Sequence, residues 1–133
     1  YNRKRYIVQR DHSILHGLCS QLGCNTIVYF SSNFCEVHYY KKVAFGSLGD
    51  INHWKALQEK AYAQNMICVI TGADLIPGAN MSLDHIKPSS VYPELTGEES
   101  NVQWVTKWVN TAKSNLEMDE FVKRCVNIAN RYN

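Results

Sequence analysis

The chain has 133 residues, enough for one domain or two very small ones with a thin apolar core. It holds 14 lysines and arginines against 12 aspartates and glutamates, and the net charge of +2 allows a polyanionic partner without requiring one. No apolar run approaches the length of a membrane span, and no signal-peptide stretch follows the basic start YNRKRY. These features argue against a membrane partner and favour a cytoplasmic protein.

Residues 1–45 combine basic charge with side chains that bind metals. Three of the five cysteines and one histidine follow the spacing C-x4-C-x10-C-x2-H. An odd cysteine count with this paired spacing favours metal binding in a reducing compartment over a disulfide framework. Four protein ligands complete the tetrahedral shell of Zn²⁺, so the predicted zinc knuckle is structural; the alternative is a set of unconnected buried cysteines. The predicted ligands are Cys19, Cys24, Cys35 and His38, and the basic residues before them are Arg3, Lys4, Arg5 and Arg10.

Residues 46–66 are predicted to form a connecting helix. The helix follows the turn sequence FGSLGD, in which Asp50 is a suitable helix cap. Apolar residues then recur at helical spacing, and Trp54 is expected to lie in the core. The residues with this spacing are Ile51, Trp54, Leu57 and Ala61.

Residues 67–133 are predicted to mix strands and helices, which makes the whole chain an α+β protein. ICVIT (67–71) and MSLDHI (81–86) are predicted to pair as a hairpin, and the polar segment 87–100 is predicted to be an exposed loop. A third strand is expected at 101–106, followed by a short helix at 107–114 and a final helix from Leu116. One face of the final helix is expected to be apolar, with Val122, Cys125, Ile128, Ala129 and Tyr132.

Asp84 and His85 are adjacent in MSLDHI, although neighbouring strand residues point to opposite faces of a sheet. A carboxylate is a hard ligand for Mg²⁺, and a neutral imidazole is a general base near pH 7. An isolated Asp–His dipeptide is common and usually has no function. The residues downstream favour a functional site, because Asn101 and Asn110 offer further oxygen ligands and Lys113 is suited to a phosphate contact.

SLDHIKP, NVQWVTKWVN and TAKSNL, taken together, resemble the HNH endonuclease motif of the ββα-metal fold, over about residues 67–133. The resemblance implies that Asp84 and Asn110 bind the catalytic metal and that His85 is the general base. It also implies that Asn101 braces the loop that orients His85. Phosphate or DNA contacts are expected from Lys113 and Lys87. The first section, 1–45, is similar to CCCH zinc modules that accompany such nucleases in phage and mobile-element proteins.

The resemblance implies a DNA endonuclease, of the homing or restriction kind, that uses Mg²⁺ or Mn²⁺ on double-stranded DNA. Its products would carry 5′-phosphate and 3′-hydroxyl ends, and cutting both strands of a palindrome would ask for a homodimer. Many family members have cysteine pairs around this motif that this chain lacks. We therefore expect Trp104 and Trp108 to pack in their place, with Cys68 and Cys125 in the core. The alternative is a non-catalytic, zinc-stabilised nucleic-acid-binding module on the same fold.

Overall fold

The structure is a computed structural model that describes residues 17–133, so the basic residues Arg3, Lys4, Arg5 and Arg10 lie outside the described residues. The described part has a mixed α+β fold with four α-helices and one two-stranded sheet, which confirms the predicted fold class. The elements in chain order are α3 (Glu36–Leu48), η1 (Ile51–His53), α4 (Trp54–Ala63), β1 (Met81–His85), η2 (Pro93–Leu95), η3 (Glu99–Asn101), β2 (Val102–Thr106), α5 (Lys107–Lys113) and α6 (Met118–Tyr132).

Helix α3 begins at the second half of the Cys/His motif and is longer than the sequence predicts. The Cys35 side chain caps it by accepting a hydrogen bond from the His38 amide, and Gly49 ends it in a left-handed conformation with φ 76°. The helix therefore continues through most of the segment predicted as a turn and crosses the expected boundary between residues 45 and 46. The turn is confined to Gly49 and Asp50, and Asp50 caps η1 as predicted. The predicted connecting helix is α4, in which Leu57 is buried.

The sheet is an antiparallel hairpin whose two strands come from different places than predicted. Strand β1 pairs with β2, with Leu83 opposite Trp104 and Asp84 opposite Gln103. The prediction that 67–71 pairs with 81–86 is wrong. Residues 67–74 instead fold into a local turn, closed by an Ile67–Asp74 bridge and a 2.7 Å hydrogen bond from the Cys68 amide to the Ala73 carbonyl. The turn satisfies these backbone groups locally, whereas β2 offers β1 a five-residue partner with a buried tryptophan.

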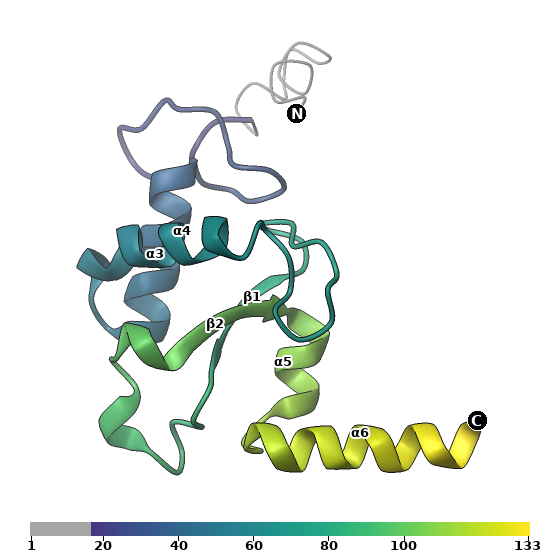
Figure 1. The fold of residues 1–133 in the computed structure, drawn as a ribbon. Helices are drawn as coiled ribbons and strands as arrows, with labels where there is room; N and C mark the ends of the chain where they lie inside the picture. The colour runs from purple at the N-terminus through teal and green to yellow at the C-terminus, as the bar shows by residue number, and fades with distance from the viewer. Residues whose placement is uncertain (1–16) are drawn as a thin grey trace.

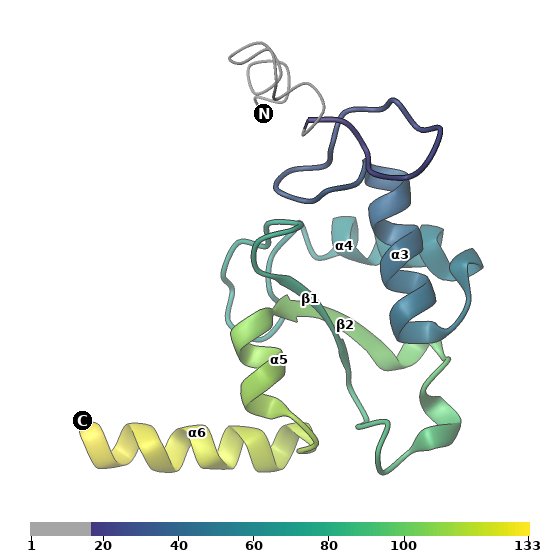
Figure 2. The same ribbon diagram turned by 180° about the vertical axis from the view of Figure 1, so that it is seen from behind.

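The two faces of the hairpin are covered by different helices (Figures 1 and 2). On one face the fully buried Trp104 ring lies 6.4 Å from the Tyr39 ring and 5.8 Å from the Tyr40 ring of α3. Its indole N–H donates to the Leu57 carbonyl of α4 at 2.9 Å. The other face carries Asp84 and receives α5. Since strand side chains alternate, His85 belongs to the Trp104 face and Asp84 to the α5 face.

The aromatic cluster around α3 is part of the hydrophobic core. The hydroxyls of Tyr29 and Tyr40 lie 3.0 Å apart, and Tyr29, Tyr39 and Tyr40 are all buried. Burial raises the pKa of Tyr40 to about 12 and raises the pKa values of Tyr29 and Tyr39 further above their usual range.

This cluster predicts a loss of stability at high pH. The folded protein keeps these phenols protonated, whereas the unfolded chain releases their protons near pH 10. The contribution of these phenols to the free energy of unfolding is therefore fully present below pH 10. It decreases as the pH rises from there toward 12. Thermal melts across this window measure the effect. Tyr40→Phe should flatten the decrease, and the same change at the exposed Tyr62 should not; equal slopes for both variants would contradict the prediction.

Helix α6 is present as predicted, and its apolar face is mostly exposed. Only Phe121 of this helix is buried, whereas Tyr132 is 86% exposed and Cys125 is also exposed. The helix extends away from the rest of the fold, so most of its apolar side chains have no other element to pack against (Figure 1).

Two further burial predictions were half right. Cys68 and Trp104 lie in the core, but Cys125 does not, and Trp108 is 63% exposed. Trp54 is half-buried and packs against the core. Within residues 17–133, no helix has the length and apolar character needed to cross a membrane.

Candidate functional site

The structure brings the four predicted ligands Cys19, Cys24, Cys35 and His38 together in one cluster. Their ligand atoms all lie within 4.8 Å of one another. The His38 Nδ1 atom lies 3.4 Å from the Cys19 sulfur and 3.2 Å from the Cys35 sulfur, and the Cys24 and Cys35 sulfurs are 4.0 Å apart. The cluster can hold a metal ion such as zinc.

These distances fit a tetrahedral shell. Zinc–ligand bonds of about 2.0–2.3 Å place two ligand sulfurs about 3.8 Å apart and a sulfur and a nitrogen about 3.6 Å apart. Hydrogen bonds from Thr26 lower the pKa of Cys24 to about 6, which favours the thiolate form that binds metals. Gly23 has a φ of 82°, a left-handed conformation that glycine adopts without strain, in the turn that leads to Cys24.

The cluster is joined to the rest of the fold at two places. Cys35 is both a candidate ligand and the N-cap of α3, so the metal site and that helix share a residue. The segment between Cys24 and Cys35 also contacts the loop before β1. The Ser31 amide donates to the Pro77 carbonyl at 3.0 Å, and Gly78 lies so close to Ser32 that a Cβ there would overlap its backbone.

Asp84 is 2% exposed, and both of its carboxylate oxygens have a donor. Lys113 Nζ lies 3.2 Å from Oδ1, and Gln103 Nε2 donates to Oδ2 at 2.9 Å. A carboxylate has about four lone-pair sites, and these two contacts use two of them.

His85 ends β1 and is half-buried, and within residues 17–133 its side chain has one polar contact. Its Nε2 atom lies 3.1 Å from the Thr96 carbonyl oxygen. A carbonyl oxygen can only accept, so Nε2 carries the proton and Nδ1 carries the lone pair. In a neutral imidazole this contact favours the tautomer that offers Nδ1 as a base.

Asn101 lies in η3 just before β2 and ties the loop after His85 to the hairpin. Its side-chain oxygen accepts from the Lys87 amide at 2.9 Å, and its side-chain nitrogen donates to the Lys87 carbonyl at 3.1 Å. The Asn101 carbonyl in turn accepts from the Ile86 amide at 2.8 Å. Asn101 therefore forms hydrogen bonds with the two residues that follow His85.

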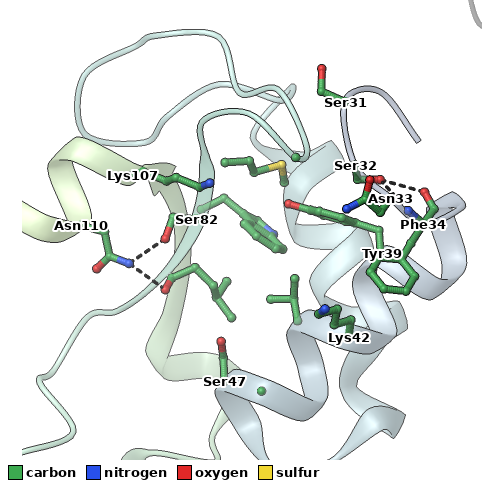
Figure 3. Close-up of a pocket in the computed structure, with 16 residues that line it drawn as sticks. Ser31, Ser32, Asn33, Phe34, Tyr39, Lys42, Ser47, Ser82, Lys107 and Asn110 are labelled. Carbon is green, nitrogen blue, oxygen red and sulfur yellow. Dashed lines mark hydrogen bonds between the residues drawn. The ribbon is translucent and has the colours of Figure 1, made fainter. Parts of the chain in front are cut away.

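Asn110 and Lys113 lie one turn apart on α5, and both face β1. The Asn110 side-chain nitrogen donates to Ser82 Oγ at 2.8 Å and to the Leu83 carbonyl at 3.2 Å, which leaves Oδ1 turned away from the strand (Figure 3). Lys113 is fully buried, and besides Asp84 its ammonium contacts the His85 carbonyl at 3.1 Å and the Ile86 carbonyl at 3.4 Å.

The two lysines predicted to contact phosphate have protein partners instead. Lys113 is enclosed as just described, so a phosphate contact would require its ammonium to leave Asp84. Lys87 forms a 3.0 Å ion pair with Glu117, which raises the pKa of Lys87 and lowers that of Glu117. It also lies 5.4 Å from the Tyr92 ring. The phosphate role of both lysines stays a prediction.

Sequence reasoning did not single out Gln103, Thr96 or Ser82, which hold Asp84, His85 and Asn110 in place. Gln103 lies opposite Asp84 in the hairpin, so correct pairing of 81–86 with 101–106 would have indicated it. Thr96 contacts His85 through its backbone carbonyl, a group that every residue has, so its residue type could not indicate this role.

Comparisons with protein-family models, with curated proteins and with solved structures each found no match for this chain.

Proposed function

We propose that this chain is a metal-dependent DNA endonuclease of the HNH type. One observation carries the proposal: β1, β2 and α5 follow one another as strand, strand and helix, and α5 packs on the strand that ends in Asp84 and His85. That order, with a carboxylate facing the helix and an imidazole at the strand end, is what the resemblance to the ββα-metal fold implies.

His85 is the proposed general base. Its Nε2–H is engaged by the Thr96 carbonyl, so Nδ1 can accept a proton from a water molecule that attacks the phosphorus. The bracing of Lys87 by Asn101 limits movement of the chain that follows the imidazole. Water attack opposite the 3′ oxygen would leave a 5′-phosphate and a 3′-hydroxyl.

Asp84 and Asn110 are the proposed ligands of Mg²⁺ or Mn²⁺. The donor types fit a hard cation, because the carboxylate of Asp84 keeps unused lone pairs and Oδ1 of Asn110 faces away from its β1 contacts. When bound, such an ion stabilises negative charge on the phosphate and on the departing oxygen. We further propose that the Cys/His cluster holds a structural Zn²⁺, since all four of its ligands come from the protein.

His85→Ala tests the function directly. The substitution should lower the rate of supercoiled-plasmid nicking by about 10²–10⁴-fold, the usual contribution of a general base. Reactions with and without Mg²⁺ measure the metal requirement, and leaving Mg²⁺ out is preferable to adding a chelator that would also strip zinc.

The matched control is His53→Ala, a partly exposed histidine that pairs with Glu99 on the surface and should leave nicking unchanged. DNA binding and circular dichroism of both variants verify the fold. Cleavage by His85→Ala at the parental rate would overturn the assignment of the base.

One observation favours the alternative of a non-catalytic nucleic-acid-binding module. The Lys113 ammonium already neutralises the buried Asp84 carboxylate, which is the role that a metal ion would have there. If the parent protein binds duplex DNA but nicks no plasmid with either Mg²⁺ or Mn²⁺, the binding module is the better description.

A further inference from the structure

A cleft of about 610 Å³ lies between α3, the segment 31–34 and the outer side of β1 (Figure 3). Its volume is in the range of sites that bind small ligands or parts of larger ones. Asn110 and Ser82 form part of its wall, so the cleft reaches one proposed metal ligand, Asn110. Among the described residues, no aspartate or glutamate lines it.

The polar groups of the cleft are suited to a phosphate chain. Lys42 and Lys107 are exposed, and within residues 17–133 neither has an acidic partner. The Lys42 ammonium lies 4.8 Å from the Phe34 ring, which directs it along the cleft wall. Hydroxyl and amide groups from Ser47 and Asn33 add hydrogen-bonding partners of the kind that commonly contact phosphate oxygens.

The aromatic residues of the cleft favour contact with the sugar–phosphate backbone of a nucleic acid over stacking with its bases. Trp104 is fully buried and Tyr39 is 8% exposed, so neither presents a free face to a nucleobase. Two unpaired ammonium groups without nearby carboxylates attract a polyanion regardless of its sequence.

We propose that this cleft binds the sugar–phosphate backbone of the DNA strand, with Lys42 and Lys107 contacting phosphates on either side. The inference rests on the proposed nuclease function for the identity of the ligand. It assigns a substrate-binding surface to α3 and to the segment between the zinc ligands Cys24 and Cys35. Lys42 and the segment 31–34 lie outside residues 67–133, which the resemblance covers, whereas Lys107 lies within that range.

The test is duplex binding by the double variant Lys42→Gln/Lys107→Gln, measured by fluorescence anisotropy over a range of salt concentrations without Mg²⁺. Two lost phosphate contacts should weaken binding by about tenfold and reduce the slope of log affinity against log salt by about 1.8. The control is Lys55→Gln/Lys123→Gln, which removes the same charge from exposed positions outside the cleft and should change both quantities much less.

The outcomes separate this inference from the proposed function because binding is measured without cleavage. Equal losses in the two double variants would overturn the cleft, even if the parent protein nicks DNA. No binding of duplex DNA by the parent would overturn it too. A selective loss in the cleft variant supports the cleft, even if no nicking is ever observed. Circular dichroism of both double variants excludes misfolding as the cause.

Discussion

Cys35→Ser should abolish metal binding by the Cys/His cluster, which we propose holds zinc, and with it most of the structure around residues 19–38. Structural Zn²⁺ binds zinc-finger peptides with apparent free energies of about 10–16 kcal/mol, and in a site of this kind much of that energy is folding energy. Serine still caps a helix, so this substitution removes the metal ligand and keeps an acceptor for the His38 amide. Zinc content by elemental analysis and thermal unfolding measure the two effects.

Two further variants separate ligation from capping. Cys35→Ala removes the ligand and the cap and should be less stable than Cys35→Ser by about 1 kcal/mol. Cys125→Ser changes an exposed thiol outside the cluster and should keep the zinc and the parental melting temperature. If the parent protein purifies without bound metal, and a chelator leaves its melting temperature unchanged, the zinc assignment is wrong.

Lys113→Met should destabilise the fold by about 3–5 kcal/mol, because it leaves the buried Asp84 carboxylate without its cation. Methionine has a similar length, so packing is largely kept and the electrostatic loss dominates. The carbonyls of His85 and Ile86 also lose a donor. Equilibrium unfolding in urea measures the change.

Adding Asp84→Asn to Lys113→Met should recover part of the lost stability, since an amide is far cheaper to bury than an unpaired charge. Lys123→Met, on the exposed part of α6, should stay within about 0.5 kcal/mol of the parent. If Lys113→Met instead keeps full stability and loses DNA affinity, the ammonium contacts phosphate as the sequence predicts, and its buried position is not the functional one.

The sequence was most informative where a residue type leaves few choices. The spacing of Cys19, Cys24, Cys35 and His38 predicted a cluster that the fold assembles. Three thiols and one imidazole are the number and kind of ligands that complete one tetrahedral metal shell. The strand at 102–106 and the helix after it were also predictable, since apolar alternation changes there to helical spacing.

Pairing and burial could not be predicted in the same way. ICVIT has the composition of a strand, yet which segment β1 pairs with depends on distant residues such as Trp104. The apolar face of α6 has the spacing of a core helix, but its exposure is set by the direction in which the helix leaves α5. The buried Lys113–Asp84 pair is visible only once α5 is packed on β1.

Helix α3 links the Cys/His segment at residues 19–38 to the sheet. It follows its N-cap Cys35, a candidate metal ligand, continues to Leu48, and supplies the rings of Tyr39 and Tyr40 that cover Trp104. A protein fragment starting at residue 46 would contain the hairpin but would lack the two tyrosine rings that cover Trp104. The Cys/His segment and the hairpin therefore belong to one packed unit, and grafting or exchange between proteins has to move both together.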